Sequence, residues 1–284
     1  MTEFLQCFLL RDGGIYTLFG SKPITVSWIE SANSKASPLT MRQFLLDLAE
    51  KEEFVKRSSM MHTTITEDTH LAVWERVQQQ LSMRNFLFLK KSNPILWDLP
   101  SDHPEADAFN SLLLINQQSL KHVLAKYYQV FQQAIGEDFS IDAVVSALDD
   151  EEGLFWQKIW NPNRHYTQGI LLGYGAMNAK IFDVCSAMES LEEARAFHNT
   201  MFRKDEETKR LANGGWEYSC ASCKLRLDQI PLPVFMCADD KYEHYALERN
   251  SFVKIFKDRD FLEVVLERLQ SSEEDFSLTI SAAS

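Results

Sequence analysis

The closely spaced glycines at positions 169, 173 and 175 constrain the fold of this chain more than any other feature. They interrupt a largely apolar segment that runs from Tyr166 to Phe182. A glycine in a helix interior costs about 1 kcal/mol relative to alanine. Glycines at this density therefore predict a turn, a close approach of two backbones, or a ligand that contacts bare amides.

Two interpretations of this segment stay open at the level of sequence. In the first, 169–172 is a strand, 173–175 a turn, and 176–188 a helix whose N-terminal amides face a phosphate. Gly173, Gly175 and Asn178 would then contact the ligand. The pattern is incomplete, because Asn178 stands where a third glycine is expected. In the second, one helix covers 166–187, and Gly169 and Gly173 allow another element to pack closely.

The composition predicts a globular protein. The chain has 284 residues, 45% of them hydrophobic, and a net charge of -12. This charge repels nucleic-acid phosphates and anionic lipids, and the apolar runs are far shorter than the roughly 20 residues that span a bilayer. Glu3 stands where a secretory signal carries a positive charge, so we expect a cytoplasmic protein. We predict one domain over 1–270 and a flexible acidic, serine-rich tail over 271–284.

The apolar patterns favour an α+β fold, predominantly helical, with a small mixed or antiparallel sheet. Runs at 4–10 and 15–20 flank an Asp-Gly pair, which predicts an N-terminal β-hairpin with a third strand over 24–29. Runs at 86–89 and 112–115 predict neighbouring strands, and further strands are expected over 216–227 and 233–236. Helices are predicted over 40–57, 68–83, from 120 to Gly136, after a Ser140 cap, over 188–212, and after an Asp260 cap.

The cysteines offer the main candidates for chemistry. There are 5, an odd number without regular spacing, which favours structural thiols over a disulfide framework. Cys220 and Cys223 form a C-x-x-C that could bind zinc with Cys237 and His244, although the spacing matches no common zinc module. As a thiol enzyme, the chain would use Cys185, Cys220 or Cys223 as nucleophile and His165 or His244 as base. No cofactor is predicted, and zinc is the alternative.

Trp156 and Trp160 lie four residues apart before Asn161-Pro162. They would share one helix face, where they could line a ligand groove or cover the edge of the core. The core position is the favoured interpretation.

Two segments resemble motifs that recur in uncharacterised proteins of intracellular bacteria: Tyr16–Pro23, with Leu-Phe-Gly-Ser-Lys-Pro, and Gly169–Asn178, with Gly-Ile-Leu-Leu-Gly-Tyr-Gly. The resemblance implies no activity and transfers no catalytic role. It suggests that the glycine pattern belongs to an architecture other than a dinucleotide fold. The tail over 271–284 resembles the C-terminal export signals of type IV secretion effectors, whereas a frayed end or an edge strand over 276–280 has much the same composition.

The leading functional prediction is a soluble, acidic binding or interaction protein, with a protein or small-molecule partner, no nucleic acid and no membrane insertion. Neither a G-x-S-x-G nor a complete P-loop pattern occurs in the chain. Secretion into a host cell as a bacterial effector is a further possibility raised by the tail. The alternative function is a thiol-dependent enzyme or a zinc-binding protein that uses Cys220, Cys223, Cys237 and His244.

Overall fold

The centre of the fold is a three-stranded antiparallel sheet. The computed structural model describes residues 5–30, 75, 78, 83, 85–92, 109–150, 153–160, 164–188, 193, 196–197, 230, 232–233 and 238–271. Its strands are β1 (Ile24–Glu30), β2 (Phe86–Ser92) and β3 (Phe109–Asn116), in the order β1-β3-β2. Phe88 lies opposite Leu114, so the predicted pairing of the runs near 86 and 112 is confirmed. Helices predominate around this sheet, which confirms the α+β class.

The predicted N-terminal hairpin is wrong. The first apolar run contains a π-helical turn, η1 (Cys7–Arg11), and the second forms the short helix α2 (Gly14–Leu18). Gly13, with φ of 78°, is the N-cap of α2 and not the turn of a hairpin. Continuous apolar runs bury equally well as strands or as enclosed helical turns, and here the helical form buries every residue of α2. Only the third run is a strand, β1, and its partner is β3.

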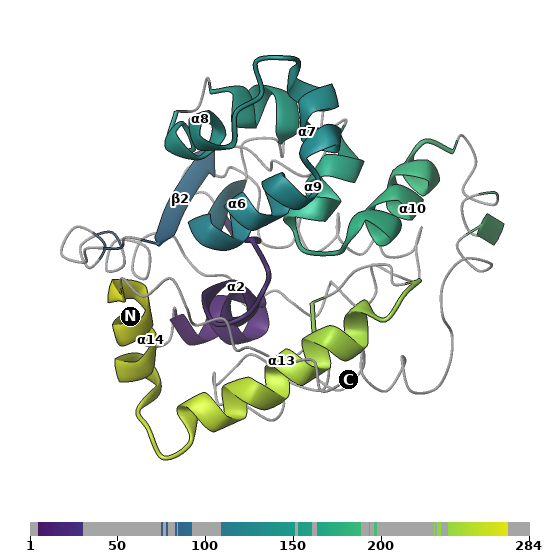
Figure 1. Ribbon diagram of the computed structural model, residues 1–284. Coiled ribbons are helices and arrows are strands. Elements are labelled where there is room, and N and C mark those ends of the chain that lie inside the picture. Colours follow the sequence, from purple (N-terminus) through teal and green to yellow (C-terminus); the bar gives the residue numbers. More distant parts are fainter. Residues whose placement is uncertain are drawn as a thin grey trace.

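Helices from the middle of the chain cover one face of the sheet, drawn above the sheet in Figure 1. They are α6 (Gln117–Lys126), α7 (Tyr128–Ile135), α8 (Ile141–Ser146), the π-helical turn η4 (Phe155–Ile159), α9 (His165–Leu171) and α10 (Ala176–Ser186). The single helix predicted from 120 to Gly136 is broken at Tyr127, whose ψ of 32° departs from helical geometry. Its predicted end at Gly136 is confirmed, as is the Ser140 cap, which accepts a hydrogen bond from the amide of Ala143.

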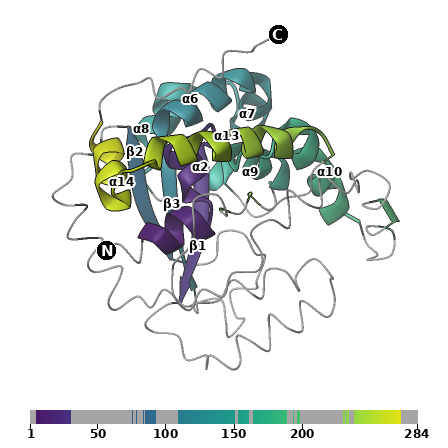
Figure 2. The same cartoon turned by 90° about the horizontal axis from the view of Figure 1, so that it is seen from below.

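Elements from the two ends of the described chain cover the other face. They are η1, α2, α13 (Lys241–Phe256) and α14 (Phe261–Gln270). Asp260 caps α14 by accepting a hydrogen bond from the amide of Glu263 at 3.0 Å, which confirms the predicted cap. Figure 2 shows α13 crossing α2, and the rings of Tyr16 and Tyr245 meet there edge to face. Among the described helices, none combines the length and apolar character that a membrane span requires.

Alternate residues of β3 supply two separate cores. Leu112 and Leu114 belong to a core that also contains Phe8, Tyr16, Phe88, Tyr245, Phe252, Phe256 and Val265. Leu113 and Ile115 belong to a second core with Ile24, Leu120, Leu124, Phe131, Phe155, Ile170 and Ala179. This division follows from the period-2 alternation of side chains along a strand. We call the first the terminal face and the second the central face.

Several predicted elements lie wholly or mostly outside the described residues. They are the helices over 40–57, 68–83 and 188–212, the strands over 216–227 and 233–236, and the tail beyond Ser271.

Candidate functional site

The glycine segment is a helix–turn–helix, which corrects both interpretations drawn from the sequence. Helix α9 ends at Leu171, a turn follows, and α10 begins at Ala176. The strand predicted over 169–172 is therefore wrong, and so is a continuous helix over 166–187. Gly173 and Gly175 have φ values of 84° and 85°, a region that favours glycine and that ends a right-handed helix. The helix predicted after 175 is confirmed.

Two of these glycines permit close packing, as predicted. A Cβ atom on Gly169 would lie 2.7 Å from the Cβ of Ala179, so α9 and α10 can approach only if position 169 carries no side chain. A Cβ atom on Gly173 would lie 3.1 Å from Cγ of Lys22 and would clash with the Tyr245 hydroxyl. The turn is thus packed against residues far away in the sequence.

A carboxylate of the chain itself lies where the sequence predicted a phosphate. Asn178, in the first turn of α10, donates hydrogen bonds from Nδ2 to the carbonyl of Tyr174 and to Oδ1 of Asp239, both at 2.8 Å. Its own oxygen accepts the amide of Ala238 at 2.8 Å. The other Asp239 oxygen, Oδ2, lies 3.9 Å from where a Cβ of Gly175 would stand. Asn178 therefore ties the turn to the residues before α13.

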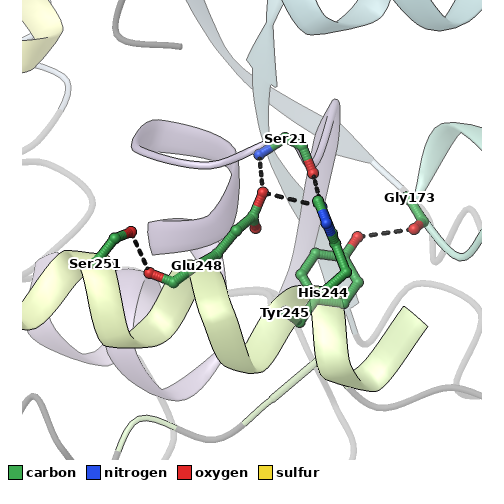
Figure 3. A network of polar contacts seen from close by, with 6 residues as sticks. All are labelled: Ser21, Gly173, His244, Tyr245, Glu248 and Ser251. Carbon is green, nitrogen blue, oxygen red and sulfur yellow. Dashed lines mark hydrogen bonds and ion pairs between the residues drawn. The ribbon is translucent and has the colours of Figure 1, made fainter. Parts of the chain in front are cut away.

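The two resembling segments, Tyr16–Pro23 and Gly169–Asn178, meet at α13. Figure 3 shows the Tyr245 hydroxyl donating a hydrogen bond to the carbonyl of Gly173 at 2.7 Å. On the neighbouring turn of α13, Oε1 of Glu248 accepts the amide of Ser21 at 2.8 Å. We call this meeting point the junction; its residues are Ser21, Lys22, Gly173, His244, Tyr245 and Glu248.

The contact between this loop and α13 also explains why position 20 is a glycine. A Cβ atom at position 20 would lie 2.6 Å from Oε2 of Glu248 and 2.8 Å from the carbonyl of Tyr16. Any side chain would therefore push α13 away from the loop that follows α2. Gly20 and Ser21 thus pack against α13.

Ser21, His244 and Glu248 have the residue types of a catalytic triad but not its geometry. Nε2 of His244 lies 2.9 Å from the Ser21 hydroxyl and 3.2 Å from Oε1 of Glu248. A charge-relay triad uses both ring nitrogens, one to accept the serine proton and the other to donate to the carboxylate. Here a single nitrogen faces both partners, so a proton on it that bonds Glu248 prevents it from accepting one from Ser21. The arrangement holds the loop and α13 together.

The junction contains buried ionisable groups. The exposed fraction is 5% for Lys22 and 4% for Glu248. Burial lowers the pKa of Lys22 to about 8, and the negative charge of Asp12 offsets only part of that effect. Burial also raises the pKa values of the Tyr16, Tyr174 and Tyr245 hydroxyls, which keeps them neutral. Ser21 and the His244 ring, by contrast, reach the surface.

The thiol and zinc candidates are not brought together within the described residues. Cys185 is buried, and burial raises the pKa of its thiol, which opposes a nucleophilic role. His165 packs its ring against Phe182, and His244 belongs to the junction. No group of three or more His, Cys, Asp or Glu in the described part of the chain could hold a metal ion. Cys220, Cys223 and Cys237 lie outside the described residues.

The two tryptophans take the predicted core position. Trp160 is 2% exposed and Trp156 is half-buried, and their rings meet at 6.2 Å. Trp156 donates its indole N–H to the carbonyl of Leu148 at 2.8 Å and carries the Lys91 amine over its ring. Both side chains belong to the central face.

Sequence reasoning missed most of the junction. Ser21, Lys22 and Glu248 carried no recognised chemical motif, although Ser21 and Lys22 lie inside the first resembling segment. The remaining signal was the spacing of His244 and Glu248, which places them on one face of a helix. Comparison with known proteins found no matching family model, no matching curated protein and no matching solved structure.

Proposed function

We propose that this chain is a binding protein whose ligand is a polar small molecule held at the junction. The observation that carries this proposal is a buried carboxylate, Glu248, one of whose oxygens has no hydrogen-bond partner in the described part of the chain. The ion-pair partner of Glu248 is His244, at 3.2 Å through the other oxygen, and Lys22 is a second buried ionisable group at the junction.

Such an arrangement is unfavourable for folding alone. Burying a charged group costs several kcal/mol unless it is paired and hydrogen-bonded, in order-of-magnitude terms. Only one carboxylate oxygen of Glu248 has a hydrogen-bond partner. Oε1 accepts a hydrogen bond from the amide of Ser21, whereas Oε2 has no hydrogen-bond partner in the described part of the chain. Buried ionisable groups with incomplete partners are concentrated at functional sites. A ligand that offers a hydrogen-bond donor to Oε2 of Glu248 would complete the partners of this carboxylate.

The exposed members of the junction support entry from the surface. The Ser21 hydroxyl and the His244 ring are partly exposed directly beside the buried carboxylate. Binding fits this geometry better than triad catalysis, because one ring nitrogen of His244 faces both Ser21 and Glu248, and burial raises the pKa of the Cys185 thiol.

A thermal-shift screen tests the proposal. Small acids, amines, alcohols and carbonyl compounds would be added singly to the full chain. At least one class should raise Tm, since a ligand that binds only the folded state stabilises it. The shift should disappear in Ser21→Ala and Glu248→Gln and persist in Lys180→Ala, an exposed lysine on α10. Absence of any shift, or equal shifts in the junction variants, would contradict ligand binding at this site.

The zinc and export predictions are tested by separate experiments. Zinc binding at Cys220, Cys223, Cys237 and His244 would be checked by metal analysis of the purified chain, with Cys220→Ser as the comparison. Export through the tail would be checked by a translocation assay with and without residues 271–284.

A further inference from the structure

We draw no further inference here: the strongest candidate, the buried carboxylate oxygen Oε2 of Glu248 that lies against Gly20 at the junction, belongs to the site already described, on which the proposed function rests.

Discussion

The two faces of the sheet are built from different parts of the chain. The central face draws nearly all its residues from Leu113 to Ala179, so its contacts are mostly local in sequence. The terminal face joins residues from Leu5 to Phe19 with residues from Ile230 to Leu269. The two faces meet in one strand, β3, which supplies Leu112 and Leu114 to the terminal face and Leu113 and Ile115 to the central face.

Aromatic rings pack against one another on both faces, and on the central face Phe155 contacts Trp156 edge to face. On the terminal face, Tyr16 contacts both Tyr245 and Phe252 edge to face, and Phe19 contacts Phe256 in the same way. Such pairs add about 0.5–1.5 kcal/mol each beyond the area that they bury. The same face borders the junction with its buried Lys22 and Glu248. The comparison shows that the face with the longest-range contacts is the one that borders the junction, whereas the central face has a buried lysine of its own, Lys91 over Trp156.

The largest effects should come from truncating one phenylalanine on each face. Phe252 and Phe131 are both fully buried, so each change to alanine should cost about 3–5 kcal/mol in the free energy of unfolding. Because local contacts form first, Phe131→Ala should mainly slow folding and Phe252→Ala mainly accelerate unfolding. Folding and unfolding rates in denaturant check this, and the reverse partition would show that the terminal face forms first.

Gly173→Ala compared with Gly175→Ala should give the next largest effect. Both glycines have positive φ values, so an added side chain strains the backbone at each position, and Gly175 also has a ψ of 158°. Only Gly173 faces an obstructing neighbour, since the nearest atom to a Cβ on Gly175 lies at 3.9 Å. We expect Gly175→Ala to lose about 1–3 kcal/mol through backbone strain, and Gly173→Ala to lose the cost of the overlap with Tyr245 in addition to its own strain. Equal midpoints in chemical denaturation would mean that α13 shifts to accommodate the new side chain without a loss of stability.

The free energy of unfolding should rise with pH between 8 and 10. Lys22 has a pKa of about 8 in the folded chain and the ordinary 10.5 when unfolded, so in this window the unfolded state binds more protons. Raising the pH then favours the folded state, by about 2 kcal/mol across the window. Burial lowers the pKa of Lys241 as well, which adds a rise of the same sign.

Above pH 10 the sign reverses. Tyr16, Tyr174 and Tyr245 keep their protons in the folded state, whereas the unfolded hydroxyls ionise. Urea titrations at intervals of pH measure both limbs. Lys22→Met should flatten the rising limb and raise stability at pH 7, and a steeper limb in this variant would rule out the buried amine as its source.

The smallest effect should come from deleting one hydroxyl on each face. Tyr245→Phe leaves the carbonyl of Gly173 without its donor, and Thr167→Val does the same to the carbonyl of Ile159 on the central side. Each change should cost about 1 kcal/mol. Only Tyr245→Phe should also weaken the ligand-induced rise in Tm, because Thr167 is not a junction residue. If both variants lost the ligand-induced rise in Tm, the loss would follow from their lower stability and not from a role of Tyr245 in ligand binding.

The sequence predicted what depends on local physics. The β2 and β3 runs, the Ser140 and Asp260 caps and the end at Gly136 follow from short-range rules. Helix α13 was missed because its buried positions include Glu248, whereas Leu247 is 55% exposed, so its apolar pattern is weak. The hairpin was wrong because an apolar run does not distinguish a strand from an enclosed helical turn.

The candidate site was predictable only in part, for a related reason. The glycines indicated that something approaches closely at position 173, and this is confirmed. The approaching group, Tyr245, lies 72 residues further along the chain, and no local pattern connects the two. Lys22 likewise has no signal of its own, because burial is decided by elements distant in sequence.

The division of the cores also sets an order of events during synthesis. Chains emerge from the ribosome N-terminus first, at about 5–20 residues per second. The sheet and the central face are complete once Ala179 has emerged, but α13 and α14 follow only by Gln270. For roughly five to twenty seconds at that rate, the aromatic side of the sheet, with Phe8, Tyr16 and Phe88, has no cover from α13 and α14. During this time the nascent chain exposes an apolar surface of the kind that chaperones bind. Any slowing of translation after residue 179 prolongs that exposure.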